Sequence, residues 1–384
     1  MWQWCGRLKM DVIHLTQQLI QFPSITPLES GCLDFIETLL KEKGFTCRRL
    51  PFGEVDNLYA RFGTSGLNFC FAGHVDVVSD IDASQWTYPP FAATIHDGVL
   101  YGRGAVDMKG AVAAFLAAAI PFIQTPFTGS ISLLLTTDEE GPAINGTRKV
   151  LEWLKENQEL IDVCLVGEPT NPLKVGEMVK IGRRGSLSFE IVVHGIAGHV
   201  AYPQLAQNPI PILIDYLREI TKTPLDQGTT EFSPSNLEIT SLDVGNTTSN
   251  IIPAKATARA NIRFNTLQSE LGLVQKLEEI AARYPLKIDI LKCPSSEAFI
   301  SKNPELIHVV NSAVKDVCGV EPLLSTTGGT SDARFIKDFC PVIEFGLVNA
   351  TAHHIDEHIA VSELETLVAV YQKILENYFN ASST

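Results

Sequence analysis

Hydrophobic residues follow two kinds of spacing along this 384-residue chain. Apolar positions recur every three to four residues in several segments, which is the spacing of amphipathic helices. These predicted helices cover residues 11–22, 31–43, 111–120, 147–157, 304–317 and 362–378. Short apolar runs of strand length occupy residues 57–62, 67–72, 99–106, 131–135, 161–166 and 342–345. Strands that alternate with helices on this scale predict an α/β fold, with a mixed or mostly parallel sheet covered by helices.

The pattern changes between residues 178 and 292. Strand-like alternation covers residues 178–193, 236–242, 251–264 and 286–292, and helical spacing covers residues 209–221 and 267–284. This strand-helix-strand-strand-helix-strand order matches a ferredoxin-like sandwich. The chain is also longer than the ~250–300 residues that usually share one core. We therefore expect one discontinuous domain of residues 1–180 and 296–384, with an inserted α+β domain of residues 181–295.

Composition and charge narrow the kinds of partner that this chain can have. A formal net charge of -14 argues against nucleic acid and anionic membranes, because both attract positively charged proteins. No apolar run approaches the roughly 18 residues that span a bilayer, and residues 1–9 have no signal-peptide core. We therefore expect a cytoplasmic protein, in which residues 1–9 are an extension or an upstream start. The eight cysteines are scattered, which predicts reduced thiols rather than disulfides.

Three consecutive carboxylates follow the apolar run Ile131–Leu135. They are Asp138, Glu139 and Glu140, and Gly141 comes directly after them. Charge at the end of a buried strand is costly unless a cation lies nearby. Neighbouring Glu139 and Glu140 cannot share one direction, so one suits a metal ion and the other suits a proton on a water molecule. A solvated acidic turn is the simpler interpretation of these residues taken alone.

Five candidate metal ligands occupy equivalent positions along the chain, because each is predicted to follow the end of an apolar strand. They are His74, Asp107, Glu140, Glu168 and His353. Groups beyond the carboxyl ends of strands meet in one crevice of an open α/β sheet, so we expect these five to converge. Two imidazoles and three carboxylates exceed the three protein ligands of a typical catalytic zinc. Two metal ions that share one carboxylate fit the set better.

Asp76 lies two positions after His74, which on an extended strand puts both side chains on one side. We expect its carboxylate to orient the imidazole. An ordinary exposed acid is the alternative for Asp76, and a core histidine is the alternative for His74 alone.

Several motifs resemble the signature of the M20 metallopeptidase family of co-catalytic zinc amidohydrolases. They are HVD at residues 74–76, GRGAVDMKG at 102–110, TDEEG at 137–141 and GEP at 167–169. The resemblance runs from about residue 11 to residue 378. It implies a mixed-sheet zinc-hydrolase domain, with the inserted domain serving as dimerisation surface and lid. It further implies a homodimer with two Zn²⁺ ions per subunit, where Co²⁺ can replace zinc at one site.

The resemblance also implies a role for each ligand. Asp107 is implied to bridge both ions, with His74 and Glu168 on one ion and Glu140 and His353 on the other. Glu139 is implied to be the general base, and the Asp107-Met108 peptide bond is implied to be cis. His353 is preferred to His354 because it directly follows the family's Asn-x-Thr-x segment, here residues 349–352.

Further motifs resemble one branch of the family. They are GRRGS at residues 182–186, GHVAYP at 198–203 and GGTSD at 328–332. They imply hydrolysis of a small polycarboxylate, N-succinyl-LL-2,6-diaminopimelate, in lysine and diaminopimelate biosynthesis. The implied substrate contacts are Arg183, Ser186, Tyr202, Asn250, Arg263 and Thr330. His199 is implied to reach the partner subunit's active site and to stabilise an oxyanion there. Guanidinium groups bind carboxylates bidentately, so Arg183, Arg184 and Arg263 are the candidates to offset the negative charge of the protein.

Two departures from the family pattern bear on specificity. Ser249 precedes Asn250 where relatives often carry paired asparagines, and Ala333 follows Asp332 where glycine is common. Other family activities, such as acetylornithine deacetylase or aminoacylase, are the alternatives. A non-catalytic binding protein on the same fold would lack ligands or base, yet all are present. Taken alone, His199 also fits a turn histidine and Arg184 a solvated arginine.

Overall fold

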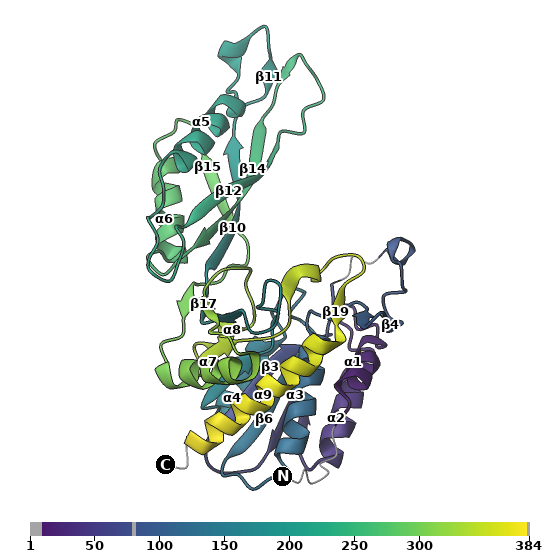
Figure 1. The fold of residues 1–384 in the computed structure, drawn as a ribbon. Coiled ribbons are helices and arrows are strands. Elements are labelled where there is room, and N and C mark those ends of the chain that lie inside the picture. Colours follow the sequence, from purple (N-terminus) through teal and green to yellow (C-terminus); the bar gives the residue numbers. More distant parts are fainter. Residues whose placement is uncertain (1–9, 79–81, 382–384) are drawn as a thin grey trace. The chain divides into compact units, whose positions relative to one another are not determined.

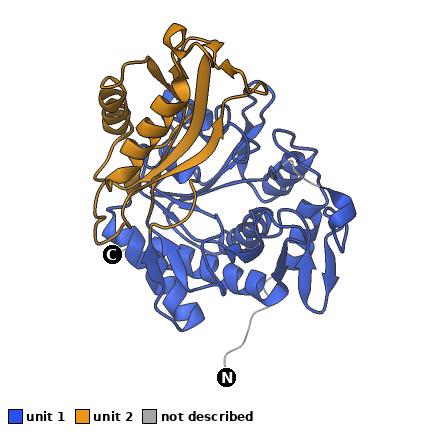
Figure 2. Ribbon diagram, turned by 90° about the horizontal axis from the view of Figure 1, so that it is seen from above, with its two compact units in different colours: residues 1–181, 301–325, 331–384 blue, residues 182–300, 326–330 orange. Residues whose placement is uncertain are grey.

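The computed structural model describes residues 10–78 and 82–381, so the N-terminal extension expected at residues 1–9 lies outside the described residues. The chain divides into two compact units, coloured separately in Figure 2. Unit 1 is Met1–Ile181, Ser301–Ser325 and Ser331–Thr384, and unit 2 is Gly182–Ile300 and Thr326–Thr330. Among the described residues, no helix has both the length and the apolar character needed to cross a membrane. The cysteines in this part of the chain are free.

Unit 1 contains an eight-stranded sheet in the order β1-β2-β6-β3-β7-β18-β8-β17. Its strands are β1 (Thr46–Arg49), β2 (Asn57–Phe62), β3 (Asn68–His74), β6 (Ser130–Thr136), β7 (Val163–Val166), β8 (Met178–Lys180), β17 (Leu323–Ser325) and β18 (Val342–Glu344). Strands β6, β3, β7 and β18 run parallel, whereas β1 and β2 pair antiparallel. The predicted α/β fold with a mixed sheet is therefore confirmed.

Helices cover the sheet of unit 1. They are α1 (Val12–Ile20), α2 (Cys32–Glu42), α3 (Lys109–Phe122), α4 (Thr147–Glu156), α7 (Pro304–Cys318), α8 (Ala333–Ile336) and α9 (Val361–Ala381). Every position of β3 and β6 is buried, so both faces of the central strands are covered. Helix α3 packs between α1 and α9 (Figure 1), and every residue of α3 except Pro121 is buried. Its alanines explain this burial, because small side chains let neighbouring helices approach from several sides.

One predicted strand of unit 1 is wrong in its extent. Residues 99–106 were expected to form one strand, but β5 ends at Tyr101. It pairs with β4 (Thr94–His96) and β19 (His358–Ala360) in a separate three-stranded sheet. The chain then turns through residues 102–108, where Gly104 has a φ of +86°. A positive φ is a conformation that glycine adopts at little cost, and it interrupts an extended strand.

Unit 2 is a four-stranded antiparallel sheet in the order β12-β14-β10-β15, with two helices. Its main elements are β10 (Gly185–His194), α5 (Pro209–Lys222), β12 (Asn236–Asp243), β14 (Lys255–Phe264), α6 (Glu270–Ala281) and β15 (Ile288–Lys292). This is the strand-helix-strand-strand-helix-strand order expected of a ferredoxin-like sandwich. Alternate residues of β10, including Leu187, Phe189 and Ile191, join the helices in one apolar core. Ser186 and Ser188 therefore face away from that core.

Short elements complete the fold. They are β9 (Gly182–Arg183), β11 (Gly198–His199), β13 (Ile251–Ile252), β16 (Phe299–Ile300) and the 3-10 turns η1 (Ala83–Gln85), η2 (Pro203–Leu205) and η3 (Asn349–Thr351). The predicted strand 251–264 is thus divided at Pro253, which has no N–H to donate to a ladder.

Candidate metal centre

Three of the five candidate ligands come from the ends of neighbouring parallel strands. His74 is the last residue of β3, Glu140 follows β6 by four residues, and Glu168 follows β7 by two residues. Strands β6, β3 and β7 are adjacent and parallel, so their carboxyl ends lie at the same edge of the sheet. The strand-end reasoning therefore holds for these three residues.

Asp107 and His353 lie in the same cluster, but other elements of the fold position them. Asp107 lies in the turn between β5 and α3 and does not follow a strand of the large sheet, so the expected reason for its position is wrong. Its peptide bond with Met108 is cis, as expected. His353 follows η3 and has a φ of +62°.

The five side chains converge around Asp107. His74 Nε2 lies 3.1 Å from Asp107 Oδ1 and 3.5 Å from Glu168 Oε1. His353 Nε2 lies 3.1 Å from Asp107 Oδ2 and 2.8 Å from Glu140 Oε1. Each oxygen of Asp107 thus faces a different imidazole. The two groups have the same members as the two predicted ligand sets, although their assignment to particular ions stays a prediction.

The donor chemistry of this cluster fits divalent cations such as zinc, which binds imidazole nitrogen and carboxylate oxygen. Ligand atoms of His74, Glu139 and Glu168 lie within 4.8 Å of one another, as do those of His74, Asp107 and Glu140. The cluster also stabilises positive charge. Hydrogen bonds with Asp107 and Glu140 raise the pKa of His353 to about 10. Burial lowers the pKa of His74, but Asp107 and Glu168 outweigh this effect and raise it well above 6.5.

The tautomer of His74 is set by a main-chain oxygen. Its Nδ1 lies 2.9 Å from the carbonyl oxygen of Asp76, which can only accept a hydrogen bond. In the neutral imidazole the proton therefore resides on Nδ1, and the lone pair of Nε2 points towards Asp107 and Glu168. This is the arrangement that a metal-binding imidazole requires.

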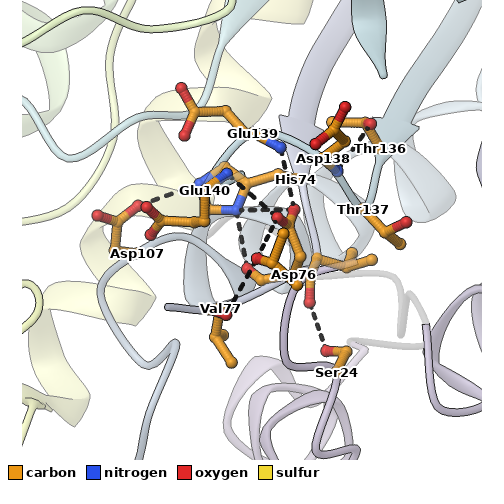
Figure 3. A network of polar contacts seen from close by, with 12 residues as sticks. Ser24, His74, Asp76, Val77, Asp107, Thr136, Thr137, Asp138, Glu139 and Glu140 are labelled. Atoms are coloured by element: carbon orange, nitrogen blue, oxygen red, sulfur yellow. Dashed lines mark hydrogen bonds and ion pairs between the residues drawn. The ribbon is translucent and has the colours of Figure 1, made fainter. Parts of the chain in front are cut away.

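The carboxylate of Asp76 has a different set of partners from the one expected. It accepts hydrogen bonds from the backbone N–H of Glu140 at 3.1 Å, the N–H of Glu139 at 3.4 Å and the hydroxyl of Thr26 at 2.8 Å. Its Oδ1 is 3.6 Å from His74 Nδ1, in range of an ion pair. Figure 3 shows the contacts that join Asp76 to the acidic turn. Asp76 therefore anchors the backbone that carries Glu139 and Glu140, while its carbonyl group orients His74.

Glu139 combines burial with neighbouring negative charge. Burial raises its pKa well above 4.5, and the carboxylates of Glu168 and Asp332 raise it further. A carboxyl group with a raised pKa is suited to exchange protons near neutral pH. Because Glu139 also belongs to one of the two candidate ligand groups, the geometry is compatible with either a ligand or a base.

Asp138 is a further buried carboxylate that holds the acidic turn, a role that the sequence did not predict. Asp138 accepts hydrogen bonds from the backbone N–H groups of Ala143, Ile144 and Asn145 at 2.9–3.2 Å. These bonds close the loop that follows Glu140. The unbroken run of three acids after a buried strand was the available signal for this role.

The remaining candidate site residues belong to unit 2. Ser186 and Arg263 are directly opposite each other on β10 and β14, and Arg183 Nη1 donates a 3.2 Å hydrogen bond to the carbonyl of Gly329. Burial and the nearby Arg184 lower the pKa of Arg263. The other candidates in unit 2 are His199, Tyr202 and Asn250, which are exposed, and Thr330, which is half-buried. Their contact with a substrate stays a prediction.

Comparison with protein families and curated proteins gives one consistent result. The model of Peptidase family M20/M25/M40 matches residues 70–377. A protein of Rhodospirillum centenum named succinyl-diaminopimelate desuccinylase is 53% identical over 380 residues, which cover 96% of this chain and 97% of the relative. A protein of Ehrlichia canis with the same name is 48% identical, with 98% and 100% of the two chains covered.

Solved structures of low sequence identity share the fold. The M20 family metallo-carboxypeptidase Sso-CP2 of Sulfolobus solfataricus superposes with a TM-score of 0.79 at 18% identity, covering 96% of this chain and 99% of that one. The YXEP protein of Bacillus subtilis, described as a dinuclear metal binding peptidase from the M20 family, gives a TM-score of 0.72 at 17% identity, with 96% and 98% covered.

Proposed function

This chain belongs to peptidase family M20/M25/M40, and we propose that it hydrolyses the amide bond of N-succinyl-LL-2,6-diaminopimelate to succinate and LL-2,6-diaminopimelate. The observation that carries the substrate is the identity of about half of all positions, over nearly the full length, with relatives named succinyl-diaminopimelate desuccinylase. The hydrolytic chemistry rests on the cluster of imidazoles and carboxylates in unit 1. This reaction belongs to lysine and diaminopimelate biosynthesis, and we assign it to the cytoplasm.

In this proposal the cluster would hold two Zn²⁺ ions, and Co²⁺ would be able to replace one of them. His74 and Glu168 would hold one ion, Glu140 and His353 would hold the other, and Asp107 would be shared between them. Support for this assignment comes from the position of Asp107, whose two oxygens each lie 3.1 Å from a different imidazole. When bound, such ions polarise an amide carbonyl and lower the pKa of water to about 7.

Glu139 serves as the general base. It takes a proton from the attacking water and gives it to the amine nitrogen when the amide bond breaks. Its raised pKa supports this role, because a carboxylate of ordinary acidity is a weak base at neutral pH. The carboxylate of Asp76 accepts hydrogen bonds from the backbone N–H groups of Glu139 and Glu140. These bonds fix the position of the proposed base, Glu139, relative to the proposed ligand, Glu140.

Unit 2 recognises the substrate and forms the homodimer. Arg183 and Arg263 bind substrate carboxylates, and Ser186, Tyr202, Asn250 and Thr330 provide further polar contacts. His199 stabilises the oxyanion in the active site of the partner subunit. Leu205, Leu242 and Ile251 of unit 2 are exposed apolar side chains that a dimer interface would cover.

The proposal is tested by a substrate panel on purified protein with metal content measured in parallel. We expect succinate release from N-succinyl-LL-2,6-diaminopimelate, little hydrolysis of acetylornithine or acylated neutral amino acids, and two zinc ions per chain. Preferential hydrolysis of acetylornithine would assign the chain to another activity of the family. Complete inactivity of the metal-loaded protein on all of these amides would favour a binding protein on the same fold.

A further inference from the structure

Glu357 is a fully buried carboxylate that none of the roles above uses. It lies four residues after His353, just before β19, and its side chain has no exposed surface. A buried charge is costly unless it is paired and hydrogen-bonded. Its partners therefore indicate why it is there.

Among the described residues, the four hydrogen-bond donors to the Glu357 side chain belong to the segment that carries Asp107. Oε1 accepts hydrogen bonds from the backbone N–H groups of Val106 at 2.8 Å and Asp107 at 3.1 Å. Oε2 accepts from the N–H of Gly104 at 2.9 Å and from Arg103 Nη1 at 2.9 Å. One carboxylate thus holds the backbone of the turn from residue 104 to residue 107, which lies outside any strand.

Arg103, which forms an ion pair with Glu357, also contacts the segment that carries His353. Arg103 is buried and stacks over the ring of Trp86, with its Cζ 5.1 Å from the ring centroid. Its Nη2 donates to the carbonyl oxygen of His353 at 3.4 Å. The backbone N–H of Gly102 donates to the carbonyl oxygen of Glu357, which adds a further bond between the two segments.

We propose that Glu357, through its ion pair with Arg103, is a positioning residue that fixes the Asp107 turn against the His353 loop. The distance between Asp107 Oδ2 and His353 Nε2, 3.1 Å in this structure, then depends on the Glu357 contacts. The inference rests on the proposed function only in treating Asp107 and His353 as metal ligands. Outer groups that orient metal ligands typically change metal affinity by 10–100-fold when they are removed.

The test is a titration of the metal-free full-length protein with Zn²⁺, without substrate. Glu357→Gln keeps the size of the side chain but turns an amide NH₂ towards two of the N–H donors. We expect its affinity for at least one Zn²⁺ ion to fall by about 10–100-fold. The visible spectrum of the Co²⁺-loaded protein should change as well, because it reports the ligand geometry. Glu357→Asp, which keeps the charge, should recover part of the affinity.

Asp226→Asn is the matched control. Asp226 accepts hydrogen bonds from the backbone of Gly228 and Ser235 and from the side chains of Asn265 and Gln268, but it belongs to unit 2 and contacts none of the five candidate ligands in these bonds. We expect this variant to lose stability while it binds Zn²⁺ like the wild type. Wild-type Zn²⁺ affinity and an unchanged Co²⁺ spectrum in Glu357→Gln would overturn the inference.

A second variant covers the case in which Glu357→Gln does not fold, as judged by circular dichroism. Arg103→Lys keeps a positive charge beside Glu357 but shortens the reach to His353. We expect a several-fold loss of Zn²⁺ affinity, and wild-type affinity would count against the inference. Failure of the proposed function would look different, because wild-type protein would then bind two zinc ions tightly and release no succinate.

Discussion

The two units differ in how some of their candidate functional residues are held, although Arg183 of unit 2 is buried and the His353 side chain of unit 1 is half exposed. In unit 1 the imidazole of His74 and the carboxylates of Asp76 and Glu357 are buried, and each is held by specific hydrogen bonds. In unit 2 His199 and Tyr202 are exposed. Buried groups with fixed partners are arranged in advance for charge stabilisation, whereas exposed groups acquire their partners when a ligand or another subunit arrives. This difference is consistent with the proposal that unit 1 carries the reaction chemistry and unit 2 contributes substrate contacts.

The largest loss of kcat is expected in unit 1, on substitution of the proposed base. Glu139→Gln removes the group that accepts the proton and should lower kcat by about 10²–10⁴-fold, the usual contribution of a general base. Zinc content, measured by plasma emission spectroscopy, should stay at the wild-type value. A variant that loses zinc together with activity would make Glu139 a ligand, which the geometry also allows.

A smaller loss is expected at Asp76. Asp76→Asn keeps one oxygen acceptor but loses the second, so it weakens the hold on the N–H groups of Glu139 and Glu140. We expect kcat to fall by roughly 10–100-fold, as measured with saturating substrate. Thr26→Val, which removes only the hydroxyl that donates to Asp76, is the control and should cost a few-fold at most. Wild-type turnover of Asp76→Asn would show that the acidic turn holds its shape without this carboxylate.

In unit 2 the expected change is in KM, on substitution of Arg263. Arg263→Met removes a half-buried guanidinium whose Nη1 has no hydrogen-bond partner among the described residues. Charge-assisted hydrogen bonds contribute about 1.5–3 kcal/mol, so KM should rise by about 10–100-fold with a smaller change in kcat. Steady-state kinetics separate the two constants. A loss confined to kcat would mean that Arg263 acts on the reaction rather than on substrate binding.

The smallest effect concerns the stability of unit 2. Burial raises the pKa of Asp226, but hydrogen bonds from Ser235 and Asn265 outweigh it and lower the pKa to about 2 overall. The unfolded chain has a higher pKa of about 3.9, so this carboxylate stabilises the fold above about pH 4 and ceases to do so as the pH falls towards 2. Asp226→Asn should lower Tm by roughly 2–4 °C near pH 6. This difference should shrink at acidic pH, and a constant difference would contradict the assignment.

Sequence patterns predicted the elements that depend on local periodicity. The helices that became α1, α2, α4 and α7, and the apolar strands β3, β6 and β7, lie close to their expected ranges. His74, Glu140 and Glu168 could be placed together from these strands alone, because parallel neighbours end at the same edge. The choice of His353 over His354 depended on the family motif, since His353 follows a 3-10 turn and itself has a positive φ, which leaves no periodic signal.

The segment around Asp107 shows where local reasoning failed. An apolar run from Val99 to Val106 looks like a strand, but Gly102 and Gly104 allow the chain to turn. The turn is held by Glu357, about 250 residues away in the sequence. No local pattern encodes a contact of that separation.

The sequence by itself determined which residue types stand at the ends of the buried strands, because hydrophobic spacing fixes strand boundaries and alternation fixes side-chain direction. Only the tertiary structure decided which backbone and side-chain groups each carboxylate binds. Asp76 binds the acidic turn through its carboxylate and His74 through its carbonyl, and Glu357 binds the Asp107 turn. These assignments depend on the paths of loops that meet only after the helices and the sheet have packed, so residues distant in sequence had to be brought together before their hydrogen bonds were defined.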